Sequence, residues 1–570
     1  MNDKIKFRSR IVLGLTVLFS IILGITLYYL QIVKGEEYAK KAEAQYIDPG
    51  TQLLKRGSIY LSSKDDIKVQ AATQKTWYKI FINPSTLKDP STAFKALSDY
   101  IDISEEDFLK KANKENDKYE PIASQVSEEV ANSIRNTKIT GIGVTKEIWR
   151  YYPGETMLSH ELGILGQNSS SSMIVGKYGL ERTYENILKR DKTSSGYAFA
   201  ELFGDNKNTE NTIAEKEGDI VTSIEPTAQK YLEKILEGIN EKWNPETVGG
   251  IIVDPNTGEI IAMSSLPNFN PNDTSTIKDV RFLSNPLVEN AYEMGSIIKP
   301  LTVATALDFG AITPKSTYED TGTMIVSGKK IANHDSKARG QTTIQDLLGY
   351  SLNVGAATIA LKVGKDDFSK YFFSFGMGSK TGIDLPNEAT GLVGNLKTGR
   401  DVEIATAAFG QGIAISPIAV TKALSILANG GKTIIPHLVK EIRYTDGTDK
   451  MIAPEVHGQV LKKETTDEVT DILVKVVDNT LVHGAIKNDH YSIAAKTGTA
   501  QIADREKGGY YKDRYLHSFF GYFPAYNPKY LVFLFQVYPK GTEYAADTLT
   551  EPFNNIVKFM INYFNIAPDR

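Results

Sequence analysis

The sequence contains no cysteine, few histidines and no excess of basic residues. Without cysteine the chain cannot form a disulfide, a thiolate zinc site, an iron–sulfur cluster or a cysteine nucleophile. Its 7 histidines show no metal-ligand spacing such as His-Glu-x-x-His, so we expect neither a metal nor another cofactor. The formal net charge of −4 argues against a general nucleic-acid binder, which needs a basic surface.

The composition is otherwise that of a folded protein, with 41% hydrophobic and 24% charged residues among 570. This length suits about three domains, or two large ones, at roughly 100–200 residues each. A chain without cysteine also suits export into an oxidising compartment. Internal repeats are not evident.

One segment is long and apolar enough to span a membrane. Residues 11–33 (IVLGLTVLFSIILGITLYYLQIV) carry no charge, and a helix of that length spans about 34 Å, more than the roughly 30 Å bilayer core. Four basic residues within residues 1–10 precede it, so the positive-inside rule places that tail in the cytoplasm and the rest outside. A cleaved signal peptide has a shorter apolar region, about 7–15 residues. We predict a single-pass cell-membrane protein with an extracytoplasmic catalytic part.

The remaining chain changes character near residue 240. Residues 34–240 mix short strand-like runs with charged helical runs, and a periodic segment at 229–243 predicts a helix linking the two halves. Residues 241–570 begin with a hairpin pattern, continue with mainly helical sequence, and end with three strand-like segments. Such an order closes one antiparallel sheet from both ends and packs helices on it, which predicts an α+β layered domain.

Four Ser-x-x-Lys pairs occur, so this spacing alone is a weak signal; their serines are Ser85, Ser275, Ser296 and Ser327. Only Ser296 opens a long apolar-periodic helix, whereas Ser85 and Ser275 lie in Pro- or Asn-rich loops and Ser327 precedes a glycine in a turn. Residues i and i+3 share a helix face, so Lys299 can approach the Ser296 hydroxyl. Lys299 can act as the base if burial and nearby cations depress its pKa. The alternative is a serine that only caps the helix.

Two further motifs lie downstream. Ser351 and Asn353 stand between two helical runs and offer a hydroxyl and an amide, suited to proton relay and to binding a substrate amide. Residues 496–499 (KTGT) lie in a strand of small residues. Lys496 there supplies positive charge for a substrate carboxylate, and Gly498 lets a substrate backbone approach closely. Taken alone, the Ser351–Asn353 motif can equally be a helix cap, and the KTGT sequence can equally be a strand that ends in a turn.

Ser-x-x-Lys, Ser-x-Asn and Lys-Thr-Gly in this order resemble the signature of penicillin-binding proteins and serine β-lactamases. The surrounding sequence resembles the class B penicillin-binding proteins, the monofunctional peptidoglycan D,D-transpeptidases. Five segments of the catalytic half carry that resemblance: NAYEMGSIIKP (290–300), YSLNVGAA (350–357), FGQGIAISP (409–417), KTGTAQ (496–501) and SFFGYFP (518–524). Three segments resemble the family's pedestal: RYYP (150–153), GLE (179–181) and GDIVTSIE (218–225).

Two departures from the family pattern stand out. Met294 occupies the place of a proline before Gly-Ser, where we expect a local backbone effect only. Residues 61–66 (LSSKDD) replace the usual Asp-Arg-Asn-Gly turn, which bears on contacts with partner proteins.

The resemblance implies a transpeptidase domain, an antiparallel sheet with helices on both faces, at residues 241–570. It implies an elongated mixed α/β pedestal or dimerisation-like domain at residues 34–240. The implied reaction is acylation of Ser296 by the penultimate D-Ala carbonyl of a stem peptide, with the Ser296 and Thr499 N–H groups as oxyanion hole. The implied site residues are Ser296, Lys299, Ser351, Asn353 and Lys496 as catalytic groups, and Thr497, Gly498 and Thr499 as substrate-binding or oxyanion groups.

The resemblance also implies partners: stem peptides ending in D-Ala-D-Ala, β-lactams, a polytopic membrane glycosyltransferase and divisome proteins, with a homodimer allowed. Length and the modest pedestal favour septal cell-wall synthesis during division; elongation is the alternative. A β-lactamase, a bifunctional class A protein and a β-lactam sensor remain alternatives. No Glu-x-x-Leu-Asn motif follows Asn353, residues 105–108 only faintly resemble a glycosyltransferase motif, and ten residues precede the expected anchor.

Overall fold

The computed structural model describes residues 19, 56–114, 117–168, 174–190, 216–277, 279–504 and 506–570. The predicted anchor at residues 11–33 lies outside the described residues except for Phe19. No helix among the described residues is both long and apolar enough to cross a bilayer. The chain divides into two compact units: one takes in Thr76–Trp149 and Leu165–Val175, and the other takes in Lys55–Lys75, Arg150–Ile164 and Gly176–Arg570.

The first unit packs three capped helices against strands. Each helix begins where a side chain accepts a backbone N–H, at Asp89, Ser104 and Ser127. Its elements are α3 (Pro90–Ser98), α4 (Glu105–Ala112), α5 (Glu128–Asn136), β3 (Glu120–Val126), β4 (Ile142–Tyr151), β5 (Leu165–Gln167), β6 (Ile174–Gly176) and the second half of β2 (Lys68–Ile82). Ile80 of β2, Leu97 and Phe108 are buried in its own small core.

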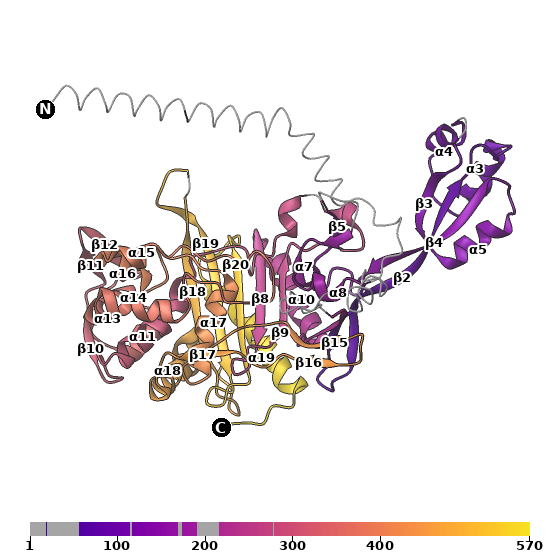
Figure 1. Ribbon diagram of the computed structural model, residues 1–570. Coiled ribbons are helices and arrows are strands. Elements are labelled where there is room, and N and C mark those ends of the chain that lie inside the picture. The colour runs from indigo at the N-terminus through magenta and orange to yellow at the C-terminus, as the bar shows by residue number, and fades with distance from the viewer. Residues whose placement is uncertain are drawn as a thin grey trace, which may run out of the picture. The chain divides into compact units, whose positions relative to one another are not determined.

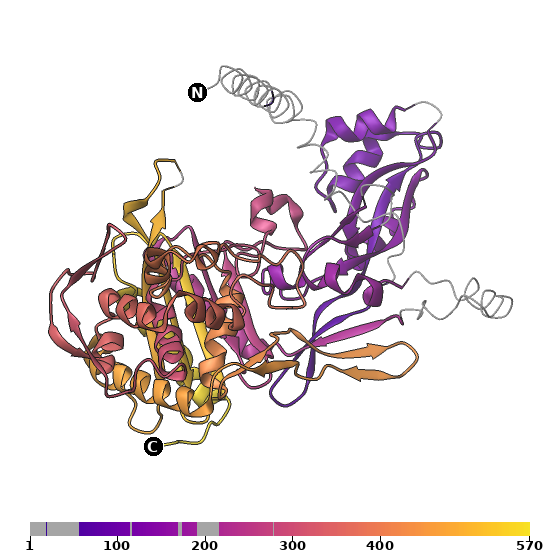
Figure 2. The same ribbon diagram turned by 60° about the vertical axis from the view of Figure 1, so that its left-hand side comes forward.

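The second unit contains two sheet regions. The first joins β1 (Ile59–Ser62), β7 (Gly218–Thr222), β15 (Val439–Tyr444) and β16 (Asp449–Met451) in the order β16-β15-β7-β1, with β1 paired to the first half of β2. The β15–β16 hairpin beside β7 is visible in Figure 2. We expected mainly helical sequence around β15, so this return of the chain to an N-terminal strand is a new finding.

A buried ionic cluster lies beside this sheet region. The Glu181 carboxylate accepts from Arg56 Nε and from Arg150 Nε, both at 2.5 Å, and all three side chains are almost fully buried. Arg56 also reaches the Glu185 carboxylate at 2.8 Å, and Arg150 Nη1 donates to Gly57 O at 2.7 Å. Two of the segments that resemble the pedestal, RYYP and GLE, supply Arg150 and Glu181 to this cluster.

The other sheet has five antiparallel strands in the order β18-β19-β20-β8-β9. The N-terminal hairpin is β8 (Thr247–Val253) and β9 (Ile260–Leu266), and the C-terminal strands are β18 (Ala494–Ala503), β19 (Tyr510–Phe523) and β20 (Tyr530–Val537). β20 pairs with β8, so strands from the two ends of the 241–570 region close one sheet (Figure 1). This confirms the α+β layered domain expected from the sequence.

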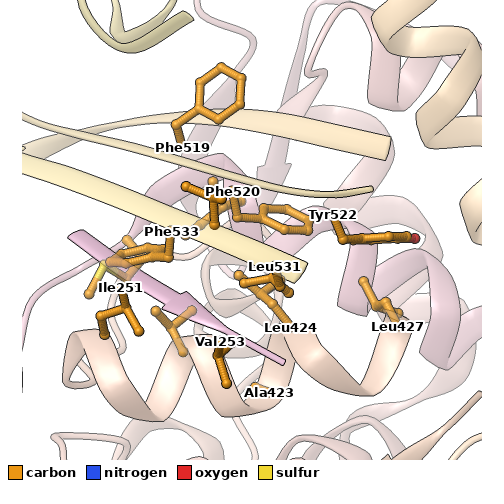
Figure 3. Packing of buried hydrophobic residues seen from close by; sticks show 14 of the residues in the cluster. Ile251, Val253, Ala423, Leu424, Leu427, Phe519, Phe520, Tyr522, Leu531 and Phe533 are labelled. Carbon is orange, nitrogen blue, oxygen red and sulfur yellow. The ribbon is translucent and has the colours of Figure 1, made fainter. Parts of the chain in front are cut away.

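Helices cover both faces of this sheet. Phe520, Tyr522, Leu531 and Phe533 point toward α17 (Pro417–Ala428), while Phe519 points to the opposite face (Figure 3). Tyr522 also shares a hydrogen bond of 2.7 Å with Thr470 of α18 (Lys463–Lys475). On the opposite face, α19 (Ala545–Tyr563) stacks Phe553 on Phe519 at 4.4 Å.

The helix predicted at residues 229–243 is α10 (Pro226–Trp243), and it packs on β8, β9 and α19 instead of serving only as a link. The remaining short helices of this unit are α6 (Ser159–Leu162), α7 (Gly179–Thr183), α8 (Glu185–Leu188), η2 (Thr274–Thr276), η3 (Val280–Leu283), η5 (Val476–Thr480) and η6 (Leu481–Gly484). The other helices and strands are η4 (Gly295–Ile298), α11 (Lys299–Asp308), α12 (Ile344–Gly349), α13 (Asn353–Val363), α14 (Lys365–Ser374), α15 (Asn395–Thr398), α16 (Asp401–Ala407), β10 (Thr317–Asp320), β11 (Thr323–Val326), β12 (Lys329–Ala332), β13 (Gly340–Thr343), β14 (Lys432–Ile434) and β17 (Val456–Gln459).

Candidate active site

Ser296 lies on a single 3₁₀ turn, η4, which leads directly into the long helix that we expected it to open. The α-helix proper, α11, begins three residues later at Lys299. Pro300 explains the difference, because proline has no N–H to donate and is favoured in the first turn of an α-helix. The helix behind the turn is buried on every side from Lys299 to Leu307, so the turn has a rigid support.

Lys299 extends from this support into the protein interior. Its side chain is completely buried, and its amine donates to Ser351 Oγ at 3.1 Å and also to Ser351 O. Burial lowers the pKa of Lys299 well below its usual value, and the nearby positive charge of Lys496 lowers it further. A lowered pKa favours the neutral amine, which is the form that can accept a proton.

Ser351 and Asn353 occupy the connection between α12 and α13, as the sequence suggested. Ser351 adopts a left-handed backbone (φ +57°), which turns its hydroxyl and carbonyl toward Lys299. Asn353 is the first residue of α13, and its amide nitrogen donates to Ala332 O at 2.9 Å. Asn333 Oδ1 accepts from Val354 N at 3.1 Å, so the β12 segment and the start of α13 hold each other in place.

The KTGT sequence lies on β18, an edge strand of the five-stranded sheet. Thr497 and Thr499 are half-buried, whereas Lys496 is almost fully buried and its amine donates to Thr497 O at 2.9 Å. Burial lowers the pKa of Lys496 to about 7. Its charge therefore depends on pH near neutrality and on whether an anion lies beside it.

Gly498 has a different neighbour from the one that we expected. A Cβ atom placed there would lie 2.7 Å from Met294 O and 3.0 Å from Ile297 N, the backbone atoms on either side of Ser296. Ser518 Oγ donates to Met294 O at 2.8 Å from the adjacent strand. The protein's own backbone, and not only a substrate backbone, needs the small residue at this position.

These elements enclose a cleft of about 800 Å³. Five of the eight predicted site residues line it: Ser296, Ser351, Asn353, Thr497 and Thr499. Lys299, Lys496 and Gly498 are buried beside it and are not among the lining residues. The structure thus brings together residues that are about 200 positions apart in the sequence.

Two sides of the cleft were not predicted. One is formed by residues 330–336, and it includes Lys330, which belongs to a Ser-x-x-Lys pair that we set aside. The other is formed by Glu543, Tyr544 and Ala546 at the start of α19. Buried His517 holds this side through hydrogen bonds of 2.9 Å to Glu543 O and to Thr548 Oγ1. Nothing in the local sequence marks this side, because it depends on how α19 meets the sheet.

Two sequence models of protein families match this chain. The sequence model described as penicillin binding protein transpeptidase domain matches residues 248–558, and the model described as penicillin-binding protein dimerisation domain matches residues 52–222. Among curated proteins, Stage V sporulation protein D of Bacillus subtilis is 30% identical over 576 residues, covering 100% of this chain and 87% of that protein.

Two further relatives show how broad the similarity is. Peptidoglycan D,D-transpeptidase FtsI of Escherichia coli K12 is 24% identical, covering 95% of this chain and 89% of its own length. Peptidoglycan D,D-transpeptidase MrdA of Acinetobacter baumannii is 25% identical, covering 93% and 84%. Among solved structures, penicillin binding protein 2X of Streptococcus thermophilus superposes with a TM-score of 0.72 at 22% identity, covering 91% of this chain and 81% of that one.

Proposed function

This chain belongs to the penicillin-binding protein transpeptidases, and on that premise we propose that Ser296 is the residue that forms its acyl-enzyme. The chain is a peptidoglycan D,D-transpeptidase: it joins stem peptides by serine acyl transfer, and β-lactams bind its transpeptidase domain. The assignment of roles to individual residues below is our proposal.

In the acylation step, Ser296 Oγ attacks the carbonyl carbon of the penultimate D-Ala, and its proton passes to the Lys299 amine. The backbone N–H groups of Ser296 and Thr499 donate to the oxyanion that forms. The bond to the terminal D-Ala then breaks, and that residue leaves with a proton relayed through Ser351. An amine of a second stem peptide attacks the ester, which forms the cross-link and releases Ser296. A β-lactam follows only the first step and remains bound.

Substrate binding is assigned to the edge of the sheet and to the Asn353 amide group. An extended peptide can add to the free edge of β18 through backbone hydrogen bonds. Its terminal carboxylate would lie near Lys496 and Thr497. A bound carboxylate raises the pKa of a neighbouring lysine, so binding would favour the charged form of Lys496, whose pKa is about 7 without a ligand.

The observation that supports this proposal most directly is the environment of Lys299. The Lys299 side chain is fully buried, and both this burial and the positive charge of Lys496 lower its pKa. Its amine contacts the hydroxyl of Ser351, which lines the cleft. Burying a lysine destabilises the folded protein. A role as general base would explain why the lysine is nevertheless buried here.

Labelling with a fluorescent penicillin tests the assignment. We expect the wild-type chain to be labelled and Ser296→Ala to remain unlabelled. Ser275→Ala and Ser327→Ala are matched controls, because both serines share the Ser-x-x-Lys spacing, and both should be labelled like the wild type. Labelling of Ser296→Ala at the same peptide would rule out Ser296 as the nucleophile. Rapid hydrolysis of the label would favour a β-lactamase.

We further propose that residues 11–33 anchor the protein in the cell membrane, with residues 1–10 in the cytoplasm and a pedestal at 34–240 carrying the transpeptidase domain at 241–570. The uncharged run and the basic residues before it support this topology. Protease added to intact spheroplasts should digest the part after residue 33 and leave the tail protected. Digestion of a tag at the N-terminus would contradict the topology.

The cellular role that we propose is septal synthesis during division, together with a membrane glycosyltransferase and divisome proteins. Full-length similarity to FtsI supports it, and similarity to MrdA supports elongation as the second candidate. Depletion of the protein in its own cell distinguishes the two, because filaments indicate division and round cells indicate elongation.

A further inference from the structure

A second hollow of about 970 Å³ continues from the catalytic cleft. The two hollows share Gln501, and β18 runs along both, with Thr497 and Thr499 in the first and residues 501–503 in the second. Ala503 lies four positions after Thr499 on this strand, which corresponds to about 13 Å. The second hollow, named the extension groove here, is thus within reach of an extended peptide whose reacting carbonyl lies at Ser296.

The direction of the peptide follows from the proposed function, on which this inference rests. Only one residue, the terminal D-Ala, lies on the leaving side of the reacting carbonyl, and its carboxylate is assigned to Lys496 and Thr497. The rest of the donor peptide must therefore extend the other way along β18, toward Gln501 and Ala503. At roughly 3.5 Å per extended residue, the residue before the penultimate D-Ala and its side chain reach the extension groove.

The lining of the extension groove combines apolar residues with acidic ones. Its apolar part includes Leu392, which is 72% exposed to solvent. Glu289, Glu293 and Glu506 also line it, whereas its described lining includes no lysine, arginine or histidine. Within the described chain none of the three glutamates forms an ion pair with a basic side chain.

Two of these carboxylates are held in place by neutral groups. Tyr510 donates from its hydroxyl to both oxygens of Glu293, at 3.2 and 3.0 Å. Glu289 accepts from Asn285 N at 3.0 Å. Neutral donors fix the orientation of a carboxylate without supplying a counter-charge. Burial raises the pKa of Glu293, and a cationic ligand beside it would favour its charged form.

We propose that the extension groove is a specificity subsite for the donor peptide and that it selects a side chain carrying a free, positively charged amine. A stem peptide that can serve as acceptor carries an amine, so the donor copy of the same peptide carries one too. The methylene chain of such a residue would lie against Leu392 and its apolar neighbours, and its ammonium group would lie among the glutamates. The same potential disfavours a donor whose side chain ends in a carboxylate.

Two synthetic acyl donors test this proposal with the full chain. They are Nα-acetyl-L-Lys-D-Ala-D-Ala and its Nα,Nε-diacetyl analogue, which differ only in the charge of the lysine side chain. The rate of acyl-enzyme formation, followed by D-Ala release before steady state, should be higher for the free amine by about fivefold or more. The triple variant Glu289→Gln/Glu293→Gln/Glu506→Gln should abolish that preference, while exposed Glu464→Gln should retain it.

Penicillin acylation separates this inference from the proposed function. If neither peptide nor penicillin acylates the wild type, the proposed function fails. If penicillin and both peptides acylate equally well in wild type and variant, the function stands and the subsite does not exist. A preference that appears only when the second amine attacks the acyl-enzyme would assign the extension groove to the acceptor and overturn the proposal.

Discussion

Replacing Gly498 with alanine should uncouple the Ser296 turn from the sheet. The added Cβ would lie 2.7 Å from Met294 O and 3.0 Å from Ile297 N, well inside ordinary van der Waals contact. Both are backbone atoms of the segment that carries Ser296, so they can make room only if the turn itself moves. Gly498 is not in the left-handed region, so alanine adds no backbone strain of its own.

The Gly498→Ala substitution should lower both the stability of the protein and its acylation rate. Overpacking of this kind destabilises a protein by about 1–3 kcal/mol. A displacement of a reacting group by about 1 Å can lower a rate about 100-fold. We therefore expect a penicillin acylation rate that falls by roughly two orders of magnitude while the protein remains folded, and a melting temperature that is lower by a few degrees.

Two further variants make the test specific. Gly238→Ala, on an exposed face of α10 with nothing within 4 Å, should leave acylation unchanged and stabilise slightly, by about 0.5–1 kcal/mol. Ser518→Ala added to Gly498→Ala removes the nearby hydroxyl, which a Cβ would also meet, but leaves the contact with Met294 O. The double variant should therefore stay slow. Acylation by Gly498→Ala at the wild-type rate, or full rescue by Ser518→Ala, would refute the backbone-contact explanation.

Two other predictions concern buried charges. Lys496, with a pKa of about 7 in the folded protein and about 10.4 when unfolded, takes up a proton on unfolding between these values, so stability should rise with pH there. Denaturant unfolding at pH 7 and pH 9 should show that rise, and Lys496→Met should reduce it; an equal rise in the variant would contradict the pKa shift. Glu181→Gln leaves the buried Arg56 and Arg150 without a full counter-charge and should cost about 3–5 kcal/mol. Its penicillin acylation at a temperature where it is folded should stay normal, and a loss of less than about 1 kcal/mol would mean that the cluster is hydrated.

The sequence was sufficient to predict the five-stranded sheet because its signals are local. Two apolar runs around a turn sequence identify the β8–β9 hairpin, and apolar runs identify β19 and β20. The order of strands and helices predicted one sheet closed from both ends of the 241–570 region, and the pairing of β20 with β8 is how the structure closes it.

Other features could not be predicted in this way because they depend on contacts between distant segments. The β15–β16 hairpin pairs with β7, more than 200 residues earlier, and its short strands have no distinctive period. The side of the cleft at Glu543–Ala546 depends on His517, whose partners are set by the position of α19. The motif residues were identified correctly as neighbours, but whether each faces the cleft or the interior depends on packing that no spacing rule describes.

The geometry around Ser296 shows why glycine recurs in three separate motifs. A Cβ on Gly498 would meet Met294 O, a Cβ on Gly295 would lie 2.8 Å from Thr499 O, and a Cβ on Gly410 would lie 2.8 Å from both the amide nitrogen and the carbonyl carbon of Gly295. The turn, β18 and the segment after α16 therefore touch largely through their main chains, and the Ser518 hydroxyl hydrogen-bonds to both Met294 O and Gly498 O. Main-chain contacts cannot adopt another rotamer, so they fix Ser296 more firmly than side-chain packing could. The proposed nucleophile, held in this way, can meet its proposed base and oxyanion donors without reorganisation during the reaction. Gly295 and Gly410 also have positive φ, so they should be at least as sensitive to substitution as Gly498.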